Sequence, residues 1–480
     1  MCYYGKFDSS AFCYFLTQEG FDTLFVPNLF GFTPFQEKFG TYDAAKKEYV
    51  ISAPWQSGIN YAPTVGEIVG LLMQGYLTDR WGYRKVTLGA LASLIPLIFI
   101  PFFCQNLTQL LIGEFLLGIP WGIFQTLSPV YVTDVTPMAL RYYLTSYINL
   151  CWVIGQIIAT GILRGLLDWK SEWAFRAPFA LQWVWPIPLI LVALSAPESP
   201  YWLMKKGKLD KVYDSVKRIN GRSVTEEEMN DNIALIKYTN DQEYLLSEST
   251  SYLECFKGIN LRRTEIASVV WLCQHSNGLG GAFFFEQVGF SAAKSFDLTV
   301  ITYAIALIGT MSSWYTSNLL GRRTLYLTGM LALTTSFLII GCMGATIPDN
   351  KSAIWAAGVL AMINGFIYNS TMGGVCYCLV PELASSRLRV KTTVLARTFY
   401  NAVGIPIGII STYMLNPTAW DLGSKTAFYW FALCFCYSVY IYFRVPETRG
   451  RTFIELDRLF EDKIPARKFS ETEVDIFHNY

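Results

Sequence analysis

Charged residues and histidines are both scarce in this chain. Of its 480 residues only 16% are charged and two are histidine, whereas 52% are hydrophobic. A soluble protein carries about 25% charged residues. The sequence also lacks the histidine and cysteine spacings of metal sites and the glycine-rich loop of phosphate sites. We therefore expect neither an enzyme nor a resident metal or cofactor, and the net charge of +1 gives no reason to expect a nucleic-acid partner.

The cysteines and the start of the chain carry no special signal. Eleven cysteines are scattered, mostly through apolar runs. The pairs Cys376/Cys378 and Cys434/Cys436 have no partners at zinc spacing, so we interpret the cysteines as small apolar packing residues. Residues 1–6 lack a basic region and a small-residue cleavage site. We expect no removable signal and a first span that directs its own insertion.

Long apolar runs are what the sequence has in abundance. A helix that crosses a bilayer needs about 20 mostly apolar residues. Several runs contain Gly, Pro or an acid, which is typical of helices that line a watery cavity. We therefore expect an all-α membrane protein. Its predicted spans are 10–34, 54–77, 86–104, 107–130, 144–165, 178–196, 265–288, 298–319, 324–347, 353–379, 393–415 and 426–444.

Charged motifs at the ends of these runs occur twice, at nearly constant spacing. Asp134 and Arg141 recur as Glu382 and Arg389, and the Pro-Glu-Ser motif at 197–199 recurs as Pro-Glu-Thr at 446–448. Segment 75–85 is echoed more weakly by 318–323. Two similar halves with charges at matching helix ends are typical of transporters built from repeats.

The repeats predict four parts: an N-terminal six-helix bundle at 1–196, a helical linker at 197–264, a C-terminal six-helix bundle at 265–445 and a tail at 446–480. Lys and Arg are concentrated in the linker and the tail. The positive-inside rule then places both in the cytoplasm. We expect a multi-pass protein of the plasma membrane with both termini cytoplasmic.

The charged motifs at 75–85, 197–203, 321–323 and 446–452 resemble those of the sugar porters of the major facilitator superfamily. A narrower set of segments is similar to fungal maltose permeases, which are proton symporters for α-glucosides. These segments are 19–23, 65–67, 139–144, 252–257, 262–265, 391–397 and 453–457.

This resemblance implies a major facilitator fold with twelve transmembrane helices in two six-helix bundles. It also implies proton-coupled uptake of maltose-like α-glucosides by alternating access. The alternatives are an uncoupled sugar facilitator, a transporter-like nutrient receptor, or an impaired paralogue whose segment before the first span is short. We expect a monomer whose partners are a sugar and the lipid bilayer, with the proton as coupling ion and no other cofactor.

Four ionisable residues lie within predicted spans: Glu19, Asp22, Glu67 and Arg397. A charge in mid-membrane costs about 2.5–3.5 kcal/mol on insertion scales, so each needs a partner or a role. The maltose permeases carry these groups at matching positions, which implies that Asp22 carries the proton. We interpret Arg397 as its counter-ion, because it is the cation placed deepest in a span. The alternative is a fixed salt bridge that only ties helices together.

One position departs from the family pattern. Sugar porters often place an Arg in the fourth helix, facing the acid of the first, but this chain has Glu114 there. An acid cannot be the counter-ion of Asp22. We expect Glu114 to sit at the membrane interface.

Sugars are bound by amide and hydroxyl side chains together with aromatic rings. Polar residues recur at helical spacing in several predicted spans. By motif match or by spacing, the candidate substrate-binding residues are Gln156, Trp152, Gln274, His275, Tyr377 and Asn401. The alternative for each is a hydrogen bond between helices.

The repeated charges at helix ends are interpreted as gating elements, with topology anchors as the alternative. A network of such pairs can bias a two-state equilibrium even when each pair contributes little. The set is Asp79, Arg84, Asp134, Arg141, Glu198, Arg322, Arg323, Glu382, Arg389 and Glu447.

Overall fold

The structure is a computed structural model. It describes residues 14–472 apart from 31, 44–47, 136–137, 221–224, 247–251, 278–280, 282–283, 287–288, 347–350, 386–387, 417–418 and 452.

The first half of the chain forms a helical bundle with one small hairpin. Prolines divide two of its predicted spans: Pro96 and Pro101 accompany the break between α4 and α5, and a 3₁₀ turn, η2, precedes Pro186. The elements are α1 (Tyr14–Leu29), α2 (Thr33–Phe39), β1 (Thr41–Asp43), β2 (Glu48–Val50), α3 (Ala53–Trp81), α4 (Tyr83–Leu97), α5 (Phe99–Phe102), α6 (Leu107–Val135), α7 (Met138–Leu166), α8 (Trp173–Leu181), η2 (Gln182–Val184) and α9 (Pro186–Ser195).

The second half repeats this arrangement after a polar helical segment. In it a π-helical turn, η6, interrupts the predicted span 353–379 just before Gly374. Its elements are α13 (Gly258–Leu272), η5 (Cys273–Asn277), α15 (Ala292–Leu319), α16 (Arg322–Thr346), α17 (Lys351–Tyr368), η6 (Asn369–Gly373), α18 (Gly374–Leu383), α19 (Arg389–Leu415), η7 (Gly423–Thr426) and α20 (Ala427–Arg444). The segment between the halves forms α10 (Pro200–Lys205), α11 (Leu209–Asn220), α12 (Glu226–Leu246) and η4 (Tyr252–Phe256), and the tail forms α21 (Phe453–Glu461) and η8 (Ala466–Lys468).

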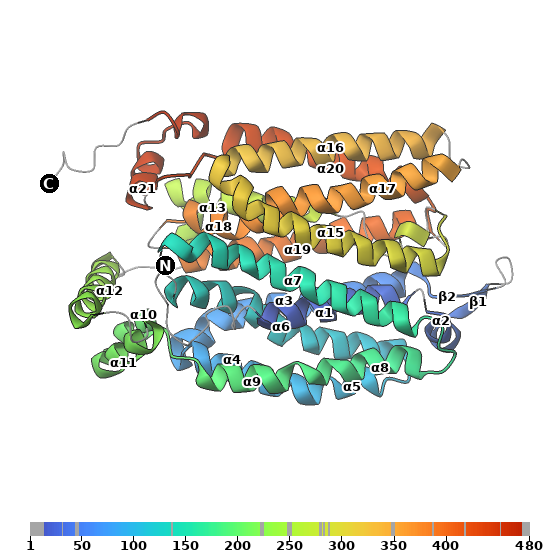
Figure 1. Ribbon diagram of the computed structural model, residues 1–480, viewed down its shortest axis with the longest axis horizontal. Helices are drawn as coiled ribbons and strands as arrows, with labels where there is room; N and C mark the ends of the chain where they lie inside the picture. Colours follow the sequence, from blue (N-terminus) through green and yellow to red (C-terminus); the bar gives the residue numbers. More distant parts are fainter. Residues whose placement is uncertain are drawn as a thin grey trace.

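The long helices run side by side along the longest axis of the molecule (Figure 1). Helices α10, α11, α12 and α21 gather at one end, and the β1–β2 hairpin lies at the other. The hairpin is antiparallel, with Tyr42 opposite Tyr49. The two ends are called the linker end and the hairpin end below, and the long helices of the two halves run between them.

Helix α13 begins at Gly258, before the predicted start of the second bundle at 265. It extends because the tail holds its polar first turns. Arg263 is buried, forms an ion pair with Asp457 of α21, and donates from Nε to the carbonyl oxygen of Leu383 at 2.8 Å. The guanidinium also lies 4.5 Å from the ring centroid of Phe460. The tail is therefore packed against the base of the second half.

In the described part of the chain, nine helical segments are long and apolar enough to cross a membrane. They coincide with nine of the twelve predicted spans. The other three correspond to α1, α3 and α13, which are shorter or carry more polar side chains; the α3 sequence includes Gln56, Asn60 and Glu67. Polar residues of α1 and α3 line a cavity and those at the start of α13 contact the tail, so the mean hydropathy of these helices falls below that of a lipid-facing helix. The prediction of an all-α membrane protein is confirmed.

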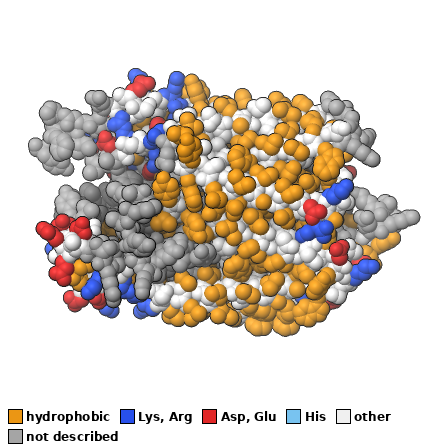
Figure 2. Space-filling view, viewed as in Figure 1, with side chains coloured by type: hydrophobic (Ala, Val, Ile, Leu, Met, Phe, Trp, Pro, Cys, Tyr) orange, Lys and Arg blue, Asp and Glu red, His pale blue; other side chains and the backbone are white. Residues whose placement is uncertain are grey.

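The surface has the polarity expected of a membrane protein. Figure 2 shows hydrophobic side chains spread over the middle of the visible face, with charged side chains confined to the two ends. Large apolar residues such as Leu72, Leu191 and Ile308 are more than half exposed. A band of this kind matches the hydrocarbon core of a bilayer, where exposed apolar side chains meet lipid instead of water.

Close packing of helices depends on glycine at a few crossings. A Cβ atom at Gly66 of α3 would overlap the carbonyl oxygen of Phe115 in α6, and a Cβ at Gly118 of α6 would overlap that of Pro63 in α3. Small residues at such positions let two helix backbones approach closely in a membrane. This crossing brings the polar faces of α3 and α6 to the same side.

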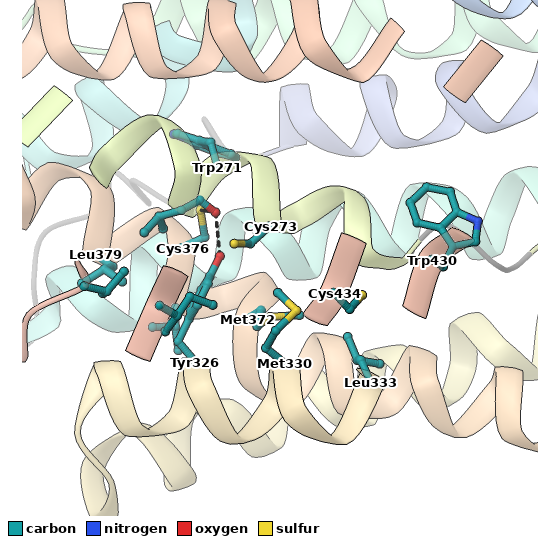
Figure 3. Close-up of a cluster of buried hydrophobic side chains, with 14 of the residues drawn as sticks. Trp271, Cys273, Tyr326, Met330, Leu333, Met372, Cys376, Leu379, Trp430 and Cys434 are labelled. Atoms are coloured by element: carbon teal, nitrogen blue, oxygen red, sulfur yellow. Dashed lines mark hydrogen bonds between the residues drawn. The ribbon is translucent and has the colours of Figure 1, made fainter. Parts of the chain in front are cut away.

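The largest buried apolar cluster lies in the second half (Figure 3). Tyr326 is fully buried there, and its hydroxyl donates to the carbonyl oxygen of Val270 at 2.7 Å. Cys273, Cys376 and Cys434 pack among these apolar side chains (Figure 3). No three His, Cys, Asp or Glu side chains in the described ranges lie close enough together to hold a metal ion.

Candidate functional site

A cavity of about 410 Å³ lies between the two halves. The first half lines it with residues of α1, α3, α6 and α7, and the second half with residues of η5, α19 and α20. On α1 the lining residues run from Glu19 to Pro27, with Phe30 just beyond the helix, and on α19 they run from Arg397 to Leu415. Because both helices end at the hairpin end, the cavity extends from the middle of the bundle toward that end.

A hydrogen-bonded layer of buried polar side chains forms the inner part of the cavity. Gln125 Nε2 donates to Glu19 Oε1 at 2.7 Å, and Arg397 Nε donates to Gln125 Oε1 at 3.0 Å. Asn401 Nδ2 donates to Glu67 Oε2 at 3.1 Å. Glu19, Glu67 and Gln125 belong to the first half, whereas Arg397 and Asn401 belong to α19 of the second. Two of the three hydrogen bonds therefore join the halves.

Aromatic rings hold Arg397 on its other side. Its guanidinium carbon lies 4.5 Å from the ring centroid of Trp271 and 4.6 Å from that of Tyr400. The His275 ring stacks on Tyr400, with 4.0 Å between centroids and 7° between planes. His275 Nε2 lies 3.1 Å from the carbonyl oxygen of Tyr400, so this nitrogen carries the proton. The Arg397 guanidinium therefore contacts the faces of two aromatic rings and donates to the side-chain amide of Gln125.

Four of the six predicted substrate-binding residues line the cavity: Trp152, Gln274, His275 and Asn401. Gln274 is already engaged, since Nε2 donates to the Tyr326 hydroxyl at 2.8 Å and to the carbonyl oxygen of Met372 at 3.2 Å. Gln274 therefore makes hydrogen bonds between helices, which was the alternative to substrate binding.

Gln156 and Tyr377 are not among the lining residues. Gln156 lies one turn beyond Trp152 on α7, and Tyr377 packs edge-on against Trp271 with ring centroids 5.2 Å apart. Helical spacing identifies a face of a helix, but it does not say how far along that face a cavity reaches. Substrate contact by Gln156 and Tyr377 therefore stays a prediction.

Asp22 and Arg397 do not form the expected pair. Asp22 is 2% exposed and is absent from the cavity lining, whereas Arg397 lines the cavity and is linked to Glu19 through Gln125. Glu114 of α6 is 1% exposed and is therefore buried within the protein, and its position at the membrane interface stays a prediction. A rotation of about 60° around α1 separates Asp22 from Glu19 and points it at α6 instead of α19.

The described gating residues show matching geometry in the two halves. Glu198 accepts hydrogen bonds from the backbone N–H of Tyr83 at 2.9 Å and of Arg84. Glu447 accepts them from the N–H of Arg322 at 2.8 Å and of Arg323 at 3.2 Å. Each acid therefore caps the helix that begins after a repeated motif, α4 or α16.

Two further ion pairs involve described gating residues. Asp79 pairs with Lys205 of α10 at 3.0 Å, and Arg322 pairs with Glu382 at 2.9 Å. Burial raises the pKa of Glu198 above its ordinary value, and the backbone donors offset part of that shift. Arg389 begins α19. The side chains of Asp134 and Arg141 lie outside the described residues.

Sequence reasoning missed three residues that help form the site. Gln125 bridges Glu19 and Arg397, and Asn60 and Tyr61 of α3 line the cavity. Gln125 is one of few amides in a long apolar run, and this was the available signal. Asn60 and Tyr61 lie about two turns before Glu67, whose presence marked α3 as a cavity helix.

Comparison with known proteins identifies the family of this chain. The family model described as "Sugar (and other) transporter" matches residues 11–460. The chain is 40% identical over 471 residues to maltose permease MAL61 and to the general alpha-glucoside permease, both from Saccharomyces cerevisiae. Each alignment covers 96% of this chain and 76% of the relative.

Solved structures agree on the fold. The proton:xylose symporter XylE, described as a major facilitator superfamily protein, superposes with a TM-score of 0.75 at 18% identity. The match covers 94% of this chain and 98% of that one. The inward-open form of XylE from E. coli gives a TM-score of 0.69. The predicted major facilitator fold is confirmed, and the relatives are named as permeases and symporters, not as enzymes. The chain belongs to the sugar transporter family.

Proposed function

We propose that the protein takes up α-glucosides, maltose-like disaccharides, together with protons by alternating access. The observation that carries this proposal is the layer in which Gln125 and Asn401 link buried acids of one half to α19 of the other. Two yeast relatives at 40% identity bear the names maltose permease and general alpha-glucoside permease. A sugar of the kind named for these relatives is a neutral, hydroxyl-rich ligand, and it suits a cavity that presents polar groups and aromatic rings.

The cavity offers acceptors that no protein donor uses. Glu19 Oε2 and Asn60 Oδ1 are buried without a hydrogen-bond partner in the described part of the chain. Sugar hydroxyls can donate to both. Trp152 and the stacked pair of His275 and Tyr400 supply flat apolar surface for the sugar rings. Sugar binding would therefore satisfy acceptors that are otherwise buried and unpaired, which is favourable.

The coupling follows from the position of the charges. Glu19, Glu67 and Arg397 are ionisable groups in the middle of the bundle, and two of the three hydrogen bonds that hold them join the two halves. Rocking of one half against the other must therefore break or remake these bonds. A change in the protonation of an acid alters the energy of that rearrangement, which is how a proton can drive it. Asp22 is proposed as the proton carrier.

The remaining features complete the proposal. The protein acts in the plasma membrane as a monomer, with both termini and residues 197–264 in the cytoplasm and the hairpin end outside. The caps formed by Glu198 and Glu447 hold the cytoplasmic helix ends of each half as it moves. The proton serves as coupling ion, no resident cofactor is needed, and nucleic acid is no partner.

Uptake of labelled maltose, sucrose, trehalose and glucose into cells without other permeases tests this function. We expect accumulation of an α-glucoside above its external concentration, and its abolition by a protonophore. Uptake that only equilibrates would indicate a facilitator. Signalling on sugar addition without any uptake would indicate a nutrient receptor.

A further inference from the structure

A second hollow lies beside the sugar cavity. It is an open groove of about 510 Å³ between α3 and α6 of the first half and α19 of the second. Its volume falls within the range of roughly 300–1,000 Å³ that is usual for small-molecule sites. None of the residues that line it is charged, and they include Ser57, Gly58, Tyr61, Val65, Phe115 and Tyr413.

The groove faces one leaflet of the bilayer. Val65 is 43% exposed and lies on the same apolar stripe of α3 as the exposed residues Val69 and Leu72. The part of α3 that lines the groove, residues 54–65, lies between the middle of the helix and the hairpin end. At 1.5 Å per residue this part is about 16 Å long, which is half of a 30 Å hydrocarbon core. A lipid of the leaflet at the hairpin end therefore covers the groove.

Divergence of α3 from α6 opens the groove. The two backbones touch at Gly66, where a Cβ atom would overlap the carbonyl oxygen of Phe115. Nearer the hairpin end, a Cβ atom at Gly58 would meet only the tip of the Leu111 side chain, at an ordinary distance of 3.4 Å. Because Gly58 has no side chain, the space between the two helices stays open there.

Tyr61 forms the wall between the groove and the sugar cavity, since it lines both. Its hydroxyl lies against α19, where a Cβ atom at Gly408 would overlap it. The groove therefore exists only while α3 and α19, which belong to different halves, lie side by side. A ligand that fills it favours this arrangement of the two halves over the others.

The lining discriminates between kinds of lipid. A phospholipid headgroup finds no ion-pair partner in it, whereas Phe115 and Tyr413 offer aromatic surface. Ser57 is 5% exposed, and its hydroxyl has no hydrogen-bond partner within the described residues. It precedes Glu67, the central residue of α3, by about 15 Å, which is the depth of the edge of the hydrocarbon core. A neutral molecule with rigid rings and one hydroxyl at that edge matches these features, and it loses less conformational entropy on binding than a flexible acyl chain.

We propose that a sterol of the hairpin-end leaflet binds in this groove, with its rings between α3, α6 and α19 and its hydroxyl paired with Ser57. Through Tyr61 and Gly408 the bound sterol stabilises the contact between the two halves beside the sugar cavity. This site goes beyond the proposed function, because its ligand comes from the bilayer and is not transported.

Photolabelling of the purified full-length protein in phosphatidylcholine vesicles that contain a photoreactive cholesterol tests this site. We expect saturable labelling of peptides that carry residues 54–65 or 409–413, suppressed by unlabelled cholesterol. Gly58→Leu puts a side chain where the rings lie and should lower this labelling about tenfold. Val65→Trp fills the other end of the groove from its exposed side. It should give the same loss, and it serves if Gly58→Leu does not fold.

Gly161→Leu is the matched control. Gly161 lies five residues from the hairpin end of α7, as Gly58 lies five residues from the start of α3, and a Cβ atom there would meet nothing. This variant should be labelled like the wild type. Labelling that does not saturate, or that is equal in Gly58→Leu and Gly161→Leu, would overturn the proposal. Labelling of the same peptides by a photoreactive phosphatidylcholine despite excess cholesterol would overturn it as well and assign the groove to an acyl chain. No sugar takes part in these measurements, so their failure is distinct from a failure of the proposed function.

Discussion

Gln125 lies between Arg397 and Glu19 and hydrogen-bonds to both, so a neutral amide separates the buried cation from an acid of the first half. An amide has one accepting end and one donating end. It can therefore satisfy a guanidinium and a carboxylate at the same time without adding a charge. The arrangement keeps Arg397 and Glu19 close while leaving the pair free to separate when the halves move.

Replacing Gln125 with Leu should lower the maximal rate of proton-driven uptake at least tenfold and change KM less. Two hydrogen bonds to charged groups are lost, each worth about 1.5–3 kcal/mol. Gln125→Glu should instead turn the hydrogen bond to Arg397 into an ion pair, remove the amide donor to Glu19, and make uptake more dependent on pH. Initial rates across sugar concentration and pH measure both effects. The control is Gln105→Leu, which removes an exposed amide; wild-type rates in Gln125→Leu would contradict the assigned role.

Asn401→Ala and Gln156→Ala should differ in their effect on sugar affinity. Asn401 lines the cavity and donates to Glu67, whereas Gln156 is not a lining residue. Loss of one hydrogen bond worth about 1.4 kcal/mol raises the half-saturation concentration about tenfold. We expect that change for Asn401→Ala and little change for Gln156→Ala, measured by concentration-dependent uptake. Equal effects of the two substitutions would place Gln156 at the substrate after all.

Asp22→Asn should abolish accumulation of sugar against its gradient and preserve exchange. A proton that enters across 100 mV and one pH unit supplies about 3.7 kcal/mol, enough for a few hundredfold accumulation. Asparagine cannot bind that proton but keeps the size and polarity of the side chain. The accumulation ratio and sugar-induced acidification of the cell are the measurements. If both persist in Asp22→Asn, Glu19 or Glu67 becomes the carrier.

Glu198→Ala and Glu447→Ala should destabilise the protein to a similar degree. Each substitution removes a carboxylate that accepts from two backbone N–H groups at a helix start. The expected cost is about 1–3 kcal/mol, seen as a lower Tm of the purified protein. Glu227→Ala, which removes an exposed acid from the first turn of α12, is the control and should leave Tm unchanged. A loss in only one of the two variants would mean that the repeated motifs are not structurally equivalent.

Local sequence predicted much of the architecture. Apolar runs of membrane-crossing length predicted the helices, and the recurrence of the Pro-Glu motif at Glu198 and Glu447 predicted two similar halves. The matching caps made by these acids explain why the motif is repeated, since each stands where a helix of its half begins. Local signals of this kind were sufficient because insertion into a bilayer depends on the composition of each segment.

The pairing of the buried charges was decided by tertiary structure. Sequence placed Glu19, Asp22, Glu67 and Arg397 inside the membrane and assigned Arg397 to Asp22, whereas the structure links Arg397 to Glu19 through Gln125. Glu19 and Asp22 are three residues apart, and the rotation between them leaves Glu19 in the cavity lining and Asp22 outside it. Which neighbour each side chain meets depends on how the helices cross, and that is set by close contacts such as Gly66 of α3 against α6. Composition and spacing along one segment determine that a helix forms and which residues share its face, whereas partners from distant segments follow only from the packing of whole helices.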